Sequence, residues 1–323
     1  MNVAANRLLV DSYLGNIRTQ RKLSGHTVSN YGRDLAELLQ FAEPVVKDAT
    51  FAAVTHFHIR KFAAQLHSKG LNARSIARKL SCWRGFFDWL SQEIALNSNP
   101  VDGVKAPKRS KPLPKALSAD DAVRLVAHAY PGKDAEATMQ RCNRAMFELL
   151  YSSGLRVSEL VGLDWRYTKE NDAVSLGWID FDAHEATVTG KGGKMRSVPI
   201  GGAAMEALTD WLAVRAPLVK NDPSPLFLNE RGNRMSVRVV QLRLKAHAQA
   251  LGIPADVHPH VLRHSFASHV LQSSGDLRAV QEMLGHASIA ATQVYTSLDF
   301  QRLAQVYDAS HPRAKKKESD TLK

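Results

Sequence analysis

Six side chains between residues 156 and 295 have the chemistry needed to attack a phosphodiester and to stabilise the charge that develops on it. They are Arg156, Lys191, His260, Arg263, His286 and Tyr295, found in the segments SGLRVSEL, TGKGGKMRSVP, HPHVLRHSFASH and LGHASIAATQVYTSL. Guanidinium, ammonium and imidazole groups can donate hydrogen bonds to a phosphate as its negative charge grows. A tyrosine hydroxyl beside them can act as the nucleophile. The residue types therefore favour phosphoryl transfer.

The settings of Arg156 and Lys191 leave more than one interpretation open. Arg156 follows a helix break, and Glu159 could pair with it on the surface, which would stabilise the protein by only about 0.3–0.5 kcal/mol. Glu159 could instead hold the guanidinium in place for a ligand. Lys191 stands at a glycine-rich hairpin, where Lys194 and Arg196 could serve the same need. The GxxxxGK[ST] order is absent, so this turn is not a P-loop.

His260 and Arg263 are three residues apart, which places them on one face of the helix that Pro259 can begin. Together they can hold two oxygens of one phosphate, with the guanidinium binding in bidentate fashion. The pair His260 and His264 has zinc-ligand spacing, but the glutamate of an HExxH motif and nearby thiolates are missing. We therefore expect no metal site.

His286 and Tyr295 are persuasive only together with the other four residues. Gly285 can end a helix over 277–284, which leaves His286 at an exposed turn. Considered alone, His286 is an ordinary helix cap and Tyr295 an ordinary core residue. Their order behind three other phosphate-binding motifs makes Tyr295 the expected nucleophile.

The first hundred residues supply helices with one basic side. Apolar residues recur at helical spacing from Val28 to Leu90, which predicts amphipathic helices over most of 6–95. Basic residues lie opposite these stripes, at Arg60, Lys61, Arg74, Arg78, Lys79 and Arg84. Because no Asp or Glu occurs between Arg60 and Arg84, we expect this side to contact DNA rather than solvent alone.

A basic, proline-rich segment then separates two expected domains. The stretch KAPKRSKPLPK over 105–115 is unsuited to a helix or strand, because proline lacks the amide donor and fixes φ. We predict domains over 1–104 and 117–323, joined by a linker over 105–116. The residues expected to contact DNA are Arg74, Arg78, Lys79, Lys108, Arg109 and Lys194.

The second domain must hold the chemistry-bearing residues. Ser118 can cap its first helix, and short strands are expected over 178–181, 186–190 and 195–200, with a hairpin turn at Gly192 and Gly193. Further helices are expected over 203–215, 236–251, 259–273, 277–284 and 299–308. The predicted fold class is mainly α with a small antiparallel β-sheet in this domain.

The bulk composition agrees with a DNA-binding protein inside the cell. The 323 residues include 43 Lys and Arg against 31 Asp and Glu, a formal charge of +12, which favours a polyanionic partner. Only two cysteines occur, without metal-ligand spacing, and the first twenty residues lack a signal-peptide pattern. We expect a cytoplasmic protein with no membrane partner.

Taken together, the four motifs resemble those of the tyrosine site-specific recombinases, the family of phage integrases and Xer proteins, over essentially the whole chain. The resemblance implies a SAM-like core-binding domain and a catalytic domain that form a C-shaped clamp on double-stranded DNA. It also implies that Arg156, Arg263 and His286 bind the scissile phosphate, Lys191 protonates the leaving oxygen, and His260 moves the tyrosine proton. Tyr295 would form a 3′-phosphotyrosine bond, with no metal and no ATP.

Within that family, GHASIAATQVYTSLD and the ending VYDASHPRAKKK resemble the Xer branch. This implies a heterotetramer with a XerD-like recombinase that resolves chromosome and plasmid dimers at a dif-like site during cell division. It also implies a DNA translocase acting on the partner, and a helix over 299–308 that docks into a neighbouring subunit. Segments 131–143 and 165–177 look longer than is usual in the family.

Three alternatives remain open at this stage. An integrase of a phage or mobile element would use the same chemistry. A non-catalytic DNA-binding protein would account for the charge and the helices, but not for the co-occurrence of the four motifs. A metal-dependent nuclease or transposase needs clustered carboxylates, and Asp180 and Asp182 on one strand are the only tempting pair.

Overall fold

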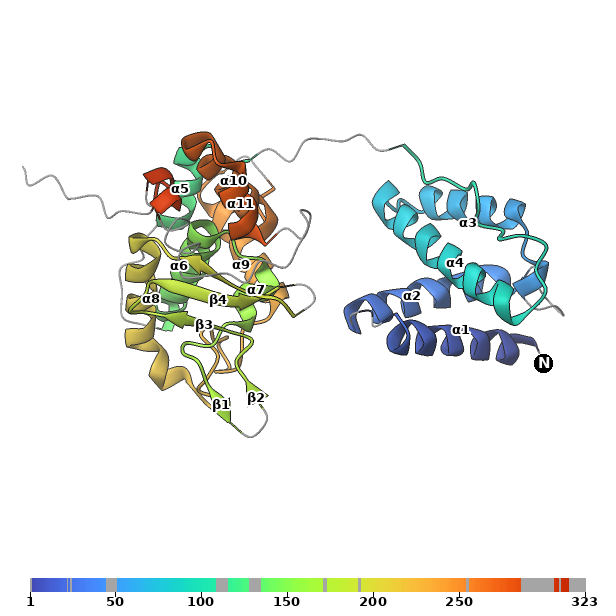
Figure 1. Cartoon of the computed structure of the whole chain (residues 1–323), viewed down its shortest axis with the longest axis horizontal. Coiled ribbons are helices and arrows are strands. Elements are labelled where there is room, and N and C mark those ends of the chain that lie inside the picture. The colour runs from blue at the N-terminus through green and yellow to red at the C-terminus, as the bar shows by residue number, and fades with distance from the viewer. Residues whose placement is uncertain are drawn as a thin grey trace, which may run out of the picture. The chain divides into compact units, whose positions relative to one another are not determined.

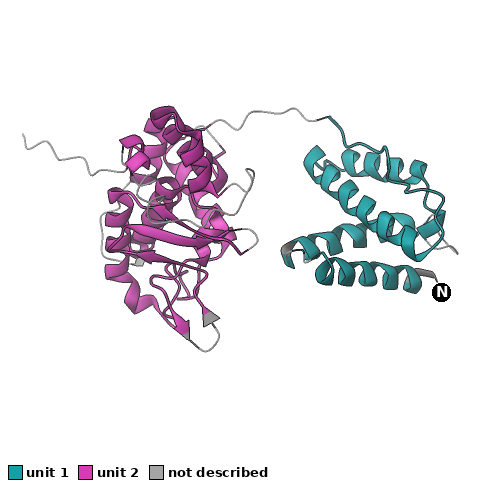
Figure 2. Ribbon diagram, in the orientation of Figure 1, with its two compact units in different colours: residues 1–112 teal, residues 113–323 magenta. Residues whose placement is uncertain are grey.

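The computed structural model describes residues 2–21, 23, 25–44, 51–108, 116–127, 135–170, 173–190, 193–253, 256–285, 305–307 and 309–313. The chain divides into two compact units, residues 1–112 and 113–323, each with its own hydrophobic core (Figure 2). The division falls inside the segment 105–116 that the sequence marks as a linker. Each unit is described separately below.

Unit 1 is helical throughout its described regular structure. Its α-helices are α1 (Asn2–Thr19), α2 (Gly25–Ala42), α3 (His56–Ser68) and α4 (Ala73–Glu93), with a short 3₁₀ turn η1 (Phe51–Ala53) before α3 (Figure 1). The apolar stripes predicted from the sequence form its core, with Leu35, Phe62 and Trp83 all buried. Helix α3 ends at Ser68, and Gly70 just beyond it adopts a φ of 82°, which glycine allows without strain.

The predicted basic side of unit 1 needs one correction. Lys79 is buried, and its Nζ lies 3.0 Å from an oxygen of Asp34 and 2.5 Å from one of Glu37. Arg78 forms an ion pair with the other oxygen of Asp34. Lys79 is therefore not part of an exposed stripe, because acids on α2 neutralise it. Arg74 remains exposed at the start of α4.

Unit 2 is a helical domain with a small sheet on one side (Figure 1). Its helices are α5 (Ala119–Ala127), α6 (Ala135–Ser153), α7 (Val157–Gly162), α8 (Gly202–Arg215), η2 (Ala216–Leu218), α9 (Val237–Ala250), α10 (Pro259–Ser274) and α11 (Leu277–Leu284). The central helix α6 packs against α5, α8 and α10. Among the described helices of both units, none is long and apolar enough to cross a membrane.

The sheet of unit 2 is a three-stranded meander. Strands β3 (Gly177–Asp180), β4 (Glu185–Thr189) and β5 (Met195–Pro199) pair antiparallel in the order β3-β4-β5, and Thr189 lies opposite Met195 at the hairpin. Gly193 in that turn has a φ of 77°, as the predicted hairpin requires. The fold class predicted from the sequence, mainly α with a small antiparallel sheet, is confirmed.

The long segment 165–177 contains structure that the sequence did not indicate. Strands β1 (Lys169–Glu170) and β2 (Ala173–Val174) form a separate two-stranded antiparallel ribbon. The hydroxyl of Thr189 donates to the carbonyl oxygen of Leu176 over 2.6 Å, which ties the base of the ribbon to β4. The ribbon is therefore joined to the main sheet without being one of its strands.

The ion-pair cluster around Asp34 gives a stability prediction. In Asp34→Asn, the buried Lys79 loses one of its two carboxylate partners, and unit 1 should lose about 3 kcal/mol of unfolding free energy. The matched control is Asp102→Asn, because Asp102 is 66% exposed and lies 3.4 Å from Arg84, so its loss should cost under about 1 kcal/mol. Hydrogen exchange of residues 1–112 in urea measures both. Equal costs would contradict the structural role assigned to Asp34.

Candidate active site

Arg156 is presented by a break between two helices. Helix α6 ends at Ser153, Gly154 follows with a φ of 57°, and Arg156 is the residue that caps the start of α7. A Cβ at Gly154 would come within 2.4 Å of the ring of Phe266, so the chain can pass here only with glycine. The break predicted before Arg156 is thus built into the packing of α6 against α10.

Glu159 is a buried carboxylate that holds two arginines. Arg156 donates to it from the backbone nitrogen and from Nη1, each over 2.8 Å. Arg196 on β5 donates from both terminal nitrogens to the two carboxylate oxygens, over 2.8 and 2.9 Å. Burial alone would raise the pKa of the Glu159 carboxyl, but Arg196 and then Arg156 lower it below its ordinary value. The interpretation of Glu159 as a weak surface partner is wrong, because Glu159 is buried and holds the guanidinium of Arg156 in place.

Arg263 is the second arginine of the predicted site and is almost fully buried. Its two terminal nitrogens donate to the carbonyl oxygens of Gly154 and Leu284, each over 2.6 Å. Burial and then the neighbouring positive charge of Arg156 lower the pKa of Arg263 to about 10. The guanidinium is therefore charged at neutral pH and is held beside a second positive charge.

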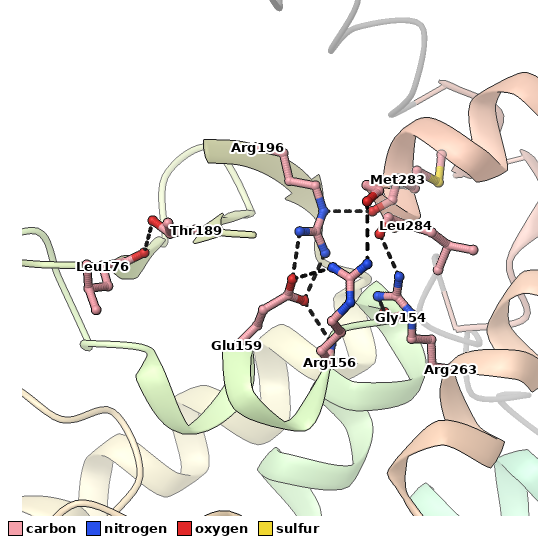
Figure 3. Close-up of polar contacts among 10 residues, drawn as sticks. Gly154, Arg156, Glu159, Leu176, Thr189, Arg196, Arg263, Met283 and Leu284 are labelled. Atoms are coloured by element: carbon pink, nitrogen blue, oxygen red, sulfur yellow. Dashed lines mark hydrogen bonds and ion pairs between the residues drawn. The ribbon is translucent and has the colours of Figure 1, made fainter. Parts of the chain in front are cut away.

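All three arginines meet the carboxy-terminal end of α11 (Figure 3). Besides the bond from Arg263 to Leu284, Arg196 donates from Nε to the carbonyl of Met283 over 3.0 Å, and Arg156 reaches the carbonyl of Gly285 at 3.4 Å. Helix ends carry partial negative charge on such carbonyls, which positive side chains stabilise. The end of the helix that leads to His286 is thereby fixed by the same groups that could bind a phosphate.

The structure brings together only part of the predicted set. His260 is exposed in the first turn of α10, three residues before the buried Arg263. Lys191, His286 and Tyr295 lie outside the described residues. The described ends of their segments, Gly190 and Gly285, both lie near the guanidinium of Arg196.

The residues predicted to contact DNA have mixed placements. Lys194 is exposed in the β4–β5 hairpin, and Lys108 is exposed at the end of unit 1. Arg109 lies outside the described residues. Arg78 is partly exposed but paired with Asp34, so its charge is partly neutralised.

The carboxylate pair considered for a metal-dependent nuclease does not exist as predicted. Strand β3 ends at Asp180, and Asp182 lies in the turn beyond it. One oxygen of Asp180 accepts hydrogen bonds from the backbone nitrogens of Asp182 and Ala183, over 3.0 and 2.9 Å. Asp180 therefore stabilises the β3–β4 turn, which accounts for its presence without a metal.

The described part of the carboxy-terminal segment packs on its own unit. Tyr307 is buried, and its hydroxyl lies 2.6 Å from that of Ser152. Arg313 forms an ion pair with the buried Glu148. Of the helix predicted over 299–308, only residues 305–307 are described, and among them Tyr307 packs on its own unit.

Arg196 contacts the candidate site directly, although its motif in the sequence indicates it only as a substitute for Lys191. The sequence does indicate that Arg196 is buried. Residues of a strand alternate between its two faces, so Arg196 lies on the same face as the apolar Val198, two residues later. A basic residue on the buried face of a strand must have a partner. That partner is Glu159, 37 residues earlier in the chain.

Comparisons with known proteins agree with this geometry. Residues 115–302 match the Phage integrase family, and residues 10–93 match the Phage integrase, N-terminal SAM-like domain. Tyrosine recombinase XerC 1 of Ralstonia nicotianae is 55% identical, covering 95% of this chain and 94% of that one. Tyrosine recombinase XerC of Pseudomonas aeruginosa is 45% identical over 95% and 96%. The XerH recombinase bound to palindromic difH substrate, in a post-cleavage complex, shares the fold with a TM-score of 0.64 at 20% identity, covering 93% of this chain and 83% of that one.

The chain belongs to the phage integrase family of tyrosine recombinases, which are DNA strand transferases. Within this class, it groups with the relatives that are named tyrosine recombinase XerC. The expected enzyme class is therefore confirmed.

The contact between α11 and Arg196 gives a prediction with a matched control. Gly285 and Gly275 have φ values of 60° and 66°, so alanine at either position costs about 1 kcal/mol of backbone strain. Of these two positions, only at Gly285 would the new Cβ also meet a side chain, that of Arg196, with Cδ, Nε and Cζ at 3.0–3.2 Å. Gly285→Ala should therefore be less stable than Gly275→Ala by about a further 1 kcal/mol, measured by thermal unfolding. Indistinguishable variants would show that the end of α11 is not held tightly.

Proposed function

We propose that this recombinase cuts and rejoins DNA through a covalent bond between Tyr295 and a 3′ phosphate. The observation that carries the proposal is the meeting of Arg156 and Arg263 at the end of α11, directly before the segment that holds His286 and Tyr295. Two guanidiniums held on buried partners are preorganised to bind the two non-bridging oxygens of one phosphate.

Three residues account for every bond and proton in the proposed reaction: Tyr295, His260 and Lys191. The hydroxyl oxygen of Tyr295 attacks phosphorus, the bond to the 5′ oxygen breaks, and the phosphate remains on the tyrosine as a 3′ ester. A tyrosine hydroxyl with an ordinary pKa near 10 must lose its proton during attack, and His260 is the group proposed to accept it. Lys191 supplies a proton to the departing 5′ oxygen. Rejoining is the same sequence in reverse, with a 5′ hydroxyl as the nucleophile.

We also propose that the reaction needs neither a metal ion nor ATP. The phosphoester bond to Tyr295 conserves the energy of the cut backbone, so no nucleotide has to be hydrolysed to rejoin it. Arginine, lysine and histidine donors stabilise the negative charge that a metal ion would otherwise offset. The described geometry supports this, because Arg156 and Arg263 both reach the end of α11 and so place two positive charges close together.

The substrate proposed is double-stranded DNA, bound by both units. The formal charge of +12 and the exposed Arg74, Lys108 and Lys194 support a polyanionic partner. The XerH structure with the same fold was solved on DNA. By the same likeness, we propose that the protein works in the cytoplasm.

The XerC relatives support a narrower role. We propose that the protein acts with a XerD-like recombinase in a heterotetramer, resolving chromosome and plasmid dimers at a dif-like site during cell division, with a DNA translocase acting on the partner. The segment around 299–308 would then leave its own unit and dock on a neighbour. Its polar anchors, the ion pair between Arg313 and Glu148 and the bond from Tyr307, are contacts that a second copy could reproduce.

The chemistry is tested on a suicide site, a recombination site that carries a nick close to the cleavage position. After cleavage the short cut strand diffuses away, rejoining is prevented, and the covalent complex accumulates. Wild-type protein should give a covalent DNA–protein band, and Tyr295→Phe should give none. Arg263→Ala should slow formation of the band by about 10²–10³-fold, the usual cost of one lost oxyanion donor. A band of normal intensity with Tyr295→Phe would overturn the assignment of the nucleophile.

The same assay separates this mechanism from metal-dependent cleavage. Because no step requires a metal ion, band formation in excess EDTA should match that in untreated buffer. A loss of cleavage that added Mg²⁺ restores would favour a metal-dependent nuclease instead.

The narrower role is tested by recombination between two copies of a candidate site from the chromosome terminus. Product should form only when a XerD-like partner from the same cell is present together with this protein. Efficient recombination by this protein alone, on a site from a mobile element, would favour the integrase alternative while leaving the chemistry in place.

A further inference from the structure

We infer that Arg196 is a positioning residue for strand transfer, which rests on the proposed role of Arg156. Arg196 neutralises Glu159, so that the charge of Arg156 stays available to the phosphate. It also joins the β-hairpin of Lys191 to the end of α11.

The first support is the geometry of the Arg196 guanidinium. Its side chain is only 5% exposed, and its two terminal nitrogens bind both oxygens of Glu159 in the parallel arrangement that suits a guanidinium and a carboxylate. Its Nε donates to the carbonyl of Met283. These donors are turned toward protein groups, so Arg196 acts on the reaction through its neighbours.

The second support is the shape of the space around it. A Cβ at Gly190 would lie 3.5 Å from Nη1 of Arg196, and a Cβ at Gly285 would lie 3.0–3.2 Å from its Cδ, Nε and Cζ. The group therefore lies between two glycines, one at the end of β4 beside Lys191 and one at the end of α11 beside His286. The residue that follows each glycine, Lys191 or His286, is a predicted site residue, so Arg196 lies where it can set the position of each segment.

The third support is the charge balance. Glu159 carries one negative charge and contacts two guanidiniums, of which Arg196 is the more buried, with 5% of its side chain exposed against 30% for Arg156. With Arg196 present, the two arginines and the carboxylate have one net positive charge, which falls on the more exposed Arg156. Without Arg196, Glu159 would neutralise Arg156, and an anion would have to compete with a buried carboxylate for it.

The test uses the full-length protein with three variants, Arg196→Gln, Glu159→Gln and the double variant. We expect Arg196→Gln to form the covalent complex on the suicide site about 10²-fold more slowly, while its Kd for the same DNA stays within about threefold of wild type. Removing the carboxylate as well should free Arg156, so the double variant should cleave about tenfold faster than Arg196→Gln. The matched control is Arg144→Gln, since Arg144 is a largely buried arginine paired with Glu206 and Asp210; its cleavage rate should be unchanged.

The double variant decides between charge and structure. If Arg196 only held the sheet against α11, removing Glu159 as well would not restore cleavage. A double variant as slow as Arg196→Gln would therefore overturn the inference. So would an Arg196→Gln protein that cleaves at the wild-type rate. A wild-type protein that forms no covalent complex would instead overturn the proposed function.

If Arg196→Gln does not fold, Arg196→Lys keeps the inference testable. Lysine retains the positive charge beside Glu159 but cannot make the paired bonds together with the Nε bond. The charge account predicts cleavage within about tenfold of wild type, because the positive charge beside Glu159 is kept. A folded Arg196→Lys protein that binds DNA normally but cleaves at least about 10²-fold more slowly would contradict it.

Discussion

The site depends on one buried carboxylate. Glu159 lies in the first turn of α7 and accepts hydrogen bonds from Arg156 beside it and from Arg196 on the sheet. A buried charge is costly unless it is fully paired, and here each oxygen has a guanidinium partner. Through these bonds a helix break, a strand and the end of α11 are held in one arrangement. Because Arg263 binds the same helix end, the two arginines proposed to bind the phosphate are fixed relative to each other in the free protein.

A small sheet is sufficient to build this arrangement. Three short strands are enough to bring Arg196 against α7 and to place the Lys191 hairpin at the same end as α11. The helices provide the rest, since α6 and α10 pack so closely at Gly154 that its carbonyl can accept from Arg263. Preorganised donors of this kind need no rearrangement during reaction, which is the main source of their catalytic value.

Local patterns in the sequence predicted the elements, and long-range pairing decided what the polar residues do. The helix from Pro259, the stop at Gly285 and the β4–β5 hairpin follow from periodicity and turn chemistry, and the structure confirms them. Lys79 was misjudged because its partners lie on another helix, which the charge count of its own segment cannot reveal. The partner of Arg196 is also distant in the chain, although the alternation of β5 places Arg196 on the same face as the buried Val198. The ribbon β1–β2 was missed because two-residue strands carry no measurable alternation.

The central claim is that the cations gathered at the end of α11 serve a nucleophile that follows in the chain. It is tested most directly by trapping the covalent complex, digesting both components and sequencing the modified peptide by mass spectrometry. The account predicts a nucleotide joined through its 3′ phosphate to Tyr295. A phosphate on any other residue, or attachment through a 5′ phosphate, would contradict it.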